Sequence, residues 1–111
     1  MKILQFPETI NQALEELQQF LAEFYGERLR GLYLYGSYAR GDYKSDSDID
    51  VLVVLGGDVN PGREIDSISN GVADICLAHN ILISTFPVSE EWLRTRKSPL
   101  FENVRREAIA L

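Results

Sequence analysis

The sequence is poor in the residues that form disulfides and zinc sites. Its 111 residues include a single cysteine, Cys76, and a single histidine, His79. One cysteine excludes a disulfide within the chain, and this pair alone cannot supply the Cys/His cluster of a structural zinc site. We therefore expect stability to come from an apolar core, formed by one domain over residues 1–111.

Basic residues are also scarce. Lys and Arg total 11 against 17 Asp and Glu, which gives a formal net charge of −6 at pH 7. A protein that binds duplex nucleic acid directly needs a basic face, so this balance argues against that class. A nucleotide bound through a metal ion stays compatible, because the metal brings positive charge to the site.

Long apolar runs are absent as well. No run approaches the ~20 residues of a membrane-spanning helix, and the start, MKILQFPET, lacks the apolar centre of a signal peptide. We therefore expect no membrane association and a cytoplasmic location. The composition, 45% hydrophobic and 25% charged, is that of a folded globular protein.

Apolar periodicity and turn residues predict alternating helices and strands. Helices are expected over residues 8–25, 63–78 and 99–110, with a short helical segment from Ser89. Strands are expected over residues 29–35, 49–55 and 81–86, the last ended by Pro87. The order helix, strand, strand, helix, strand, helix predicts a mixed α/β (α+β) domain whose helices flank the sheet.

The second long helix has one apolar stripe, made of Ile65, Ile68, Val72 and Ile75. At ~100° per residue, Asp74 lies roughly 140° from the centre of that stripe. Asp74 is therefore expected to face solvent.

Negative charge is densest in GSYARGDYKSDSDIDVLV, residues 36–53, which ends in an apolar strand. Side chains alternate along a strand, so Asp48 and Asp50 share one face at its start. Two such carboxylates repel each other and lose hydration unless a cation compensates them. Mg²⁺ is suited to this, because one or two carboxylates commonly hold it together with substrate phosphates. For an isolated Asp-x-Asp, capping of a turn is the alternative.

Gly36 and Ser37 follow directly on the preceding predicted strand. A small backbone with a hydroxyl group can approach a phosphate and donate hydrogen bonds from the Ser37 N–H and Oγ. Arg40 and Lys44 lie in the same stretch. Each is a candidate phosphate contact or a solvated basic residue.

This stretch resembles the nucleotidyltransferase superfamily typified by DNA polymerase beta, and within it the minimal nucleotidyltransferases of prokaryotes. The resemblance is carried by Gly36-Ser37, followed after ten residues by Asp48-Ile49-Asp50. The resemblance covers roughly residues 32–55. It implies a nucleotidyltransferase fold in which Gly36 and Ser37 hold the triphosphate of ATP. It also implies that Asp48 and Asp50 are catalytic and bind Mg²⁺, with Arg40 as a further nucleotide-binding residue.

The resemblance also implies a reaction and a partner. The expected reaction is Mg²⁺-dependent transfer of a nucleoside monophosphate, AMP from ATP, to a hydroxyl acceptor. Small members of the family commonly occur beside an all-helical HEPN-domain protein in toxin–antitoxin pairs, and some adenylylate a tyrosine of that partner. A HEPN-type protein is therefore the expected partner, with this chain as antitoxin. Association into an oligomer stays open.

One departure from the family pattern bears on activity. Members that catalyse transfer usually carry a third acidic residue on the next strand, but residues 81–86 contain none, and Leu82 or Ser84 stands at that place. Asp46 or Asp74 could replace the missing acid, or no residue does. The alternative function is a catalytically degenerate nucleotidyltransferase fold that neutralises its partner by binding alone.

Overall fold

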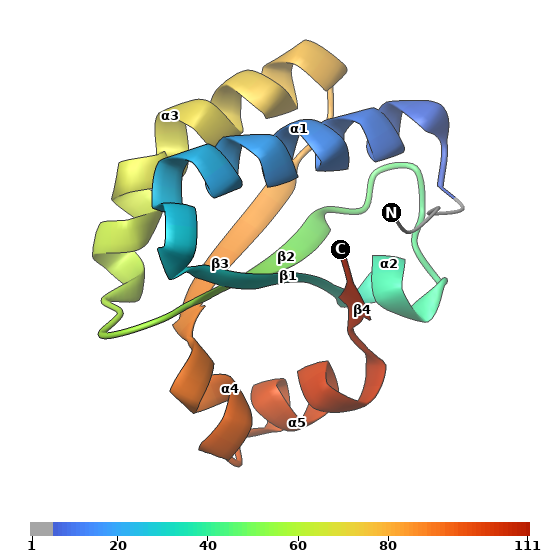
Figure 1. The fold of residues 1–111 in the computed structure, drawn as a ribbon. Coiled ribbons are helices and arrows are strands. Elements are labelled where there is room, and N and C mark those ends of the chain that lie inside the picture. The colour runs from blue at the N-terminus through green and yellow to red at the C-terminus, as the bar shows by residue number, and fades with distance from the viewer. Residues whose placement is uncertain (1–5) are drawn as a thin grey trace.

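The computed structural model describes residues 6–111 as a four-stranded sheet between two layers of helices (Figure 1). The elements are α1 (Glu8–Tyr25), a 3-10 turn (Gly26–Arg28), β1 (Leu29–Tyr35), α2 (Ser37–Arg40), β2 (Ile49–Leu55), α3 (Pro61–His79), β3 (Ile83–Ser89), α4 (Glu90–Thr95), α5 (Pro99–Glu107) and β4 (Ile109–Ala110). The strand order is β3-β2-β1-β4, with β2 parallel to β3 and the other pairs antiparallel. The predicted mixed α/β architecture is confirmed. Within the described range, no helix has the length and apolarity that crossing a membrane requires.

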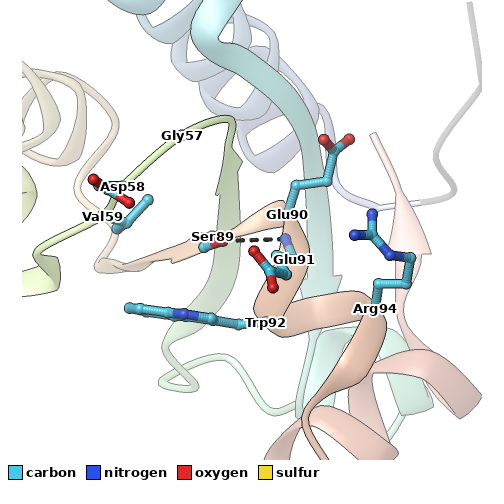
Figure 2. Close-up of a pocket in the computed structure, with 8 residues that line it drawn as sticks. All are labelled: Gly57, Asp58, Val59, Ser89, Glu90, Glu91, Trp92 and Arg94. Atoms are coloured by element: carbon cyan, nitrogen blue, oxygen red, sulfur yellow. Dashed lines mark hydrogen bonds between the residues drawn. The ribbon is translucent and has the colours of Figure 1, made fainter.

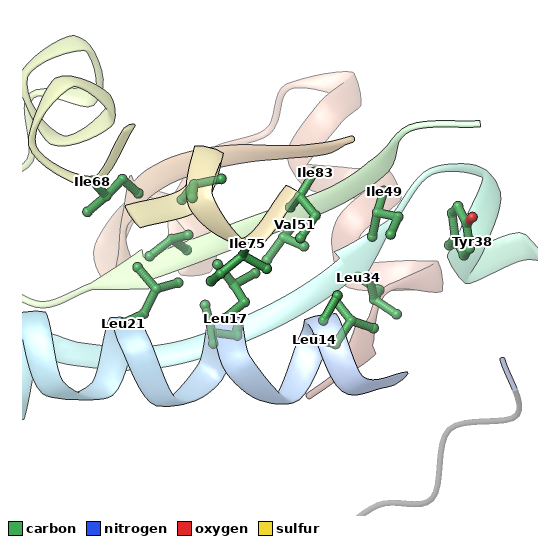
Figure 3. Close-up of a cluster of buried hydrophobic side chains, with 14 of the residues drawn as sticks. Leu14, Leu17, Leu21, Leu34, Tyr38, Ile49, Val51, Ile68, Ile75 and Ile83 are labelled. Atoms are coloured by element: carbon green, nitrogen blue, oxygen red, sulfur yellow. The ribbon is translucent and has the colours of Figure 1, made fainter. Parts of the chain in front are cut away.

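The larger hydrophobic core lies between the sheet and the helices α1 and α3 (Figure 3). Every third or fourth residue of α1 is fully buried there, including Leu14, Leu17 and Leu21. Alternate residues of β2, such as Ile49 and Val51, point into the same core. Packed side chains therefore fill most of this face of the sheet, and a hollow of about 300 Å³ lies beside α1, β1 and Leu111.

A smaller core covers the opposite face of the sheet. It consists of Leu52 and Val54 from β2, Val88 from β3, and Phe101 and Val104 from α5. Since side chains alternate along β2, the residue before Leu52 on this face is Asp50. The acidic end of β2 therefore belongs to the face that α4 and α5 cover only in part.

The third strand differs from its prediction at both ends. It runs from Ile83 to Ser89 and includes Pro87, which was expected to end it. The Ile49 N–H donates to Leu82 O at 2.9 Å, so even-numbered residues of β3 exchange hydrogen bonds with β2. The backbone nitrogen of Pro87 therefore points to the outer edge of the strand, while its side chain is buried. Proline is tolerated on an edge strand at such a position, because no ladder N–H is needed there.

The last helix ends earlier than predicted. It stops at Glu107, and Ile109 and Ala110 form β4, which pairs with Leu34 and Tyr33 of β1. The pairing holds the end of α5 next to the strand that leads into Gly36. A two-residue strand has too little sequence pattern to be recognised before the fold is known.

The first turn of α3 also differs from its prediction. Ile65 is 38% exposed, whereas Glu64 is only 8% exposed. The Glu64 carboxylate accepts a hydrogen bond from the Tyr25 hydroxyl at 3.1 Å and forms an ion pair with Arg28 at 2.7 Å. A buried carboxylate with two partners therefore takes the place expected of Ile65, while the rest of the stripe is buried or nearly so.

Replacing Glu64 by Ala is expected to destabilise the fold by about 1–3 kcal/mol, because it leaves the Tyr25 hydroxyl and the Arg28 guanidinium without their shared acceptor. Chemical denaturation followed by circular dichroism measures the change. Asp66→Ala is the matched control, since Asp66 is an exposed carboxylate on the same helix. Equal losses in the two variants would contradict this role of Glu64.

Candidate functional site

The predicted Gly-Ser turn and the acidic strand start lie side by side. β1 and β2 are antiparallel with Tyr35 opposite Asp50, so Gly36 follows directly beside that carboxylate. A Cβ atom at position 36 would lie 2.5 Å from Asp50 Oδ2. Gly36 also has φ 72° and ψ −149°, a region that only glycine adopts readily. Glycine is therefore required here for both space and backbone conformation.

The single helical turn α2, which begins at Ser37 and ends at Arg40, follows directly on Gly36. The Gly36 carbonyl accepts hydrogen bonds from the Ala39 and Arg40 N–H groups, both at 3.1 Å. On its inner side Tyr38 is buried and stacks on Tyr43, with ring centroids 4.2 Å apart. The turn is thus anchored in the core, and Tyr38 is not available to stack on a nucleotide base.

The two aspartates form a local concentration of negative charge. Asp48 is exposed and Asp50 is partly buried. Burial, followed by the charge of Asp48, raises the pKa of Asp50, while Arg40 lowers it. Burial and the Asp50 charge likewise raise the pKa of the Tyr35 hydroxyl. Carboxylate oxygens that repel each other at the start of a strand are a donor set that fits a hard divalent cation.

Arg40 stands at the rim of this site with two ion-pair partners. Its Nε lies 3.4 Å from Asp42 Oδ2 and its Nη1 lies 3.7 Å from Glu107 Oε1. Sequence reasoning did not identify Glu107, because its approach depends on the position of α5 and on the pairing of β4. No sequence signal near Arg40 points to it.

The position expected of a third acid is held by Ser84. This exposed residue lies opposite Asp50 in the parallel register of β2 and β3. Asp74 is exposed on α3, as predicted, and α3 covers the other face of the sheet. Over residues 6–111, no three or more His, Cys, Asp or Glu side chains are arranged to hold a metal ion. Neither Asp46 nor Asp74 therefore joins Asp48 and Asp50 in such a group.

A cavity of about 400 Å³ lies at the other end of the sheet (Figure 2). Its lining residues are Gly57, Asp58, Val59, Ser89, Glu90, Glu91, Trp92 and Arg94. These residues lie at or just after the C-terminal ends of β2 and β3, whereas the aspartate pair marks the beginning of β2. The cavity is therefore separate from the Gly36–Asp50 contact, and the Arg96 guanidinium already lies 4.1 Å from the centre of the Trp92 ring.

A mixed sheet in which one strand ends in Gly-Ser and its antiparallel neighbour begins with Asp-x-Asp is the framework of a nucleotidyltransferase. The chain belongs to the nucleotidyltransferase domain family, whose model matches residues 11–99. Two similar proteins of Methanocaldococcus jannaschii are described as candidate protein adenylyltransferases. One is 36% identical over 80 residues, covering 72% of this chain and 74% of the relative. The other is 32% identical over 75 residues, covering 68% and 75%.

Solved structures show the same fold at lower sequence identity. A toxin–antitoxin complex with AMP-PNP matches with a TM-score of 0.61 and 20% identity, over 86% of this chain and 69% of that one. A candidate nucleotidyltransferase from Sulfolobus solfataricus matches with a TM-score of 0.57 and 20% identity, over 98% and 90%. A variant of the toxin–antitoxin complex MntA–HpeT gives 0.57 and 18%, over 86% and 70%. The predicted nucleotidyltransferase fold is confirmed.

Proposed function

We propose that this chain transfers AMP from ATP to a hydroxyl group of a protein. The observation that carries the proposal is the close approach of Asp50 to the Gly36 turn, where an added Cβ would lie 2.5 Å from Asp50 Oδ2. It supports a site in which the turn binds phosphate beside a carboxylate that binds metal. The descriptions of the two Methanocaldococcus relatives support a protein as acceptor. The AMP-PNP in a complex of the same fold supports an adenine nucleotide.

In this proposal the aspartates bind the metal ion, and the residues of the Gly36 turn bind the phosphates. Asp48 and Asp50 would hold Mg²⁺, and the ion would supply positive charge beside the phosphates. The Ser37 N–H and Oγ and the Arg40 guanidinium bind the phosphate oxygens. Because Tyr38 anchors the Gly36 turn in the core, these donors keep a fixed place relative to Asp50. The acceptor oxygen bonds to the α-phosphorus, the bond from that phosphorus to the α,β-bridging oxygen breaks and pyrophosphate leaves, and the hydroxyl proton passes to solvent.

The partner that we propose is a HEPN-type toxin, with a hydroxyl side chain of the toxin as acceptor. This chain would then act as the antitoxin in the cytoplasm, where ATP is available. Two toxin–antitoxin complexes among the structures of similar fold support this assignment.

Transfer is tested by incubating the chain with α-labelled ATP, Mg²⁺ and a candidate HEPN-type partner taken from a neighbouring gene. Label is expected on the toxin with the parent chain and not with Asp48→Ala, and toxicity should persist with that variant. A toxin that stays unlabelled but is neutralised equally by both chains would show that neutralisation occurs by binding alone.

Binding without transfer is the second candidate function, and the serine at position 84 favours it. Ser84 replaces the acid expected opposite Asp50, and the described chain offers no substitute within reach of the pair. A site with two carboxylates can bind a metal–nucleotide complex, but it lacks the group that helps to deprotonate the acceptor.

Replacing Ser84 by Asp is expected to complete the carboxylate set. The new side chain lies in register with Asp50, so we expect Mn²⁺ to bind at least about tenfold more tightly, because one more negative charge faces the ion. Calorimetry measures the affinity, and the transfer assay shows whether the rate also rises. Ser84→Asn is the control with the same shape and no charge. A parent chain that is inactive beside an active Ser84→Asp variant would identify the natural protein as a binding module.

A further inference from the structure

Arg40 is a basic side chain close to the aspartate pair, yet it is directed toward other carboxylates. It forms ion pairs with Asp42 and Glu107, and it affects Asp50 only through space. Among the ion pairs of residues 6–111, none joins Arg40 to Asp50. Asp50 is partly desolvated, and an ion pair gains strength where water is excluded. The two ion pairs direct the Arg40 guanidinium to carboxylates other than Asp50.

Asp42 makes the shorter contact with Arg40, an Nε hydrogen bond at 3.4 Å, but Glu107 is the partner fixed outside the loop of Arg40. The side chain of Glu107 is 26% exposed and that of Asp42 is 63% exposed, so water screens the Glu107 pair less. Asp42 lies two residues from Arg40 in the same loop and moves with it. Glu107 is the last residue of α5. This helix is held in place by Phe101 and Val104 in the smaller core and by the pairing of β4 with β1.

We propose that Glu107 is a positioning residue, which holds Arg40 off Asp50 and so keeps the aspartate pair open to a divalent cation. The consequence for metal rests on the proposed role of Asp48 and Asp50. In a chain without Glu107, the guanidinium pairs with Asp50 and competes with the cation for the same oxygen atoms. The phosphate-binding role of Arg40 needs the same arrangement, because a guanidinium bound to Asp50 has fewer donors to offer.

The test is Mn²⁺ binding without nucleotide, followed by electron paramagnetic resonance. We expect E107Q to weaken binding about twofold to fivefold, the range that corresponds to one partly exposed ion pair. The matched control is E102Q, an exposed carboxylate on the same helix, which should leave Mn²⁺ affinity unchanged.

The decisive comparison is the effect of R40Q in two backgrounds. If Glu107 holds Arg40 away, R40Q improves Mn²⁺ binding more strongly in the E107Q chain than in the parent chain. If Glu107 only contributes negative charge to the site, R40Q improves binding by the same factor in both backgrounds. Equal factors would overturn the proposal.

A second measurement needs no metal. A double-mutant cycle on the free energy of unfolding, with R40Q and D50N, measures the coupling between Arg40 and Asp50. We expect negligible coupling in the parent chain and favourable coupling in the E107Q chain. Unchanged coupling would refute the positioning role. New coupling in a chain that binds no Mn²⁺ would support that role and reject the proposed metal function.

Discussion

Asp50→Asn is expected to lower the rate of nucleotidyl transfer by about a thousandfold or more, because it removes an anionic ligand from the proposed metal site. The side chain keeps its shape, so the fold and the Gly36 contact should persist. Label transfer from ATP to the proposed toxin partner measures the rate, and circular dichroism confirms folding.

Asp74→Asn is the control for this prediction. It makes the same change of charge on α3, on the other side of the sheet, and transfer should continue at the parent rate. A loss of transfer with Asp74→Asn, or its survival in Asp50→Asn, would contradict the assignment of the site.

Asp50→Asn should also make the metal-free protein more stable than the parent chain at neutral pH. Burial and Asp48 raise the pKa of Asp50 in the folded chain above its ordinary value of 3.8. Between these two pKa values the folded state binds more protons than the unfolded state, so stability falls as pH rises through that window. Asp50→Asn lacks this fall. Denaturation in chelator over a pH series should show its advantage at neutral pH and none below the ordinary pKa.

Gly36→Ala is expected to reduce both stability and transfer. The backbone at position 36 is nearly exclusive to glycine, which costs about 1–3 kcal/mol for any other residue. The new Cβ would also lie 2.5 Å from Asp50 Oδ2, so the carboxylate must move. A displacement of about 1 Å in a catalytic group can reduce the rate about a hundredfold. Unfolding curves and the transfer assay measure the two effects separately.

Gly57→Ala separates the two effects of the Gly36 substitution. Gly57 also has a positive φ, 79°, but no atom lies within 4 Å of its added Cβ. This variant should lose stability through backbone strain and keep its transfer rate. An equal loss of transfer in both variants would mean that the Gly36 effect is one of folding and not of the site.

The proximity of Gly36 and Asp50, at the centre of the candidate site, could be predicted from the sequence because the two residues are close in the chain. Gly36 and Asp50 belong to consecutive strands, so an antiparallel pairing was enough to bring them together. The features that were missed depend on distant contacts. Glu64 is buried because Arg28 and Tyr25 meet it across the fold, and Glu107 reaches Arg40 only after α5 has packed. Neither contact has a local pattern to reveal it.

The outer edge of β3 has a consequence for the protein in concentrated solution. An exposed strand edge invites a further strand through its unused N–H groups. Here Pro87 has no N–H, and the Ile83 N–H already donates to Cys76 Sγ at 3.3 Å. An incoming chain therefore finds a broken ladder, which discourages edge-to-edge polymerisation and domain swapping. Pro87, which was expected to end this strand, thus removes a hydrogen-bond donor from its outer edge.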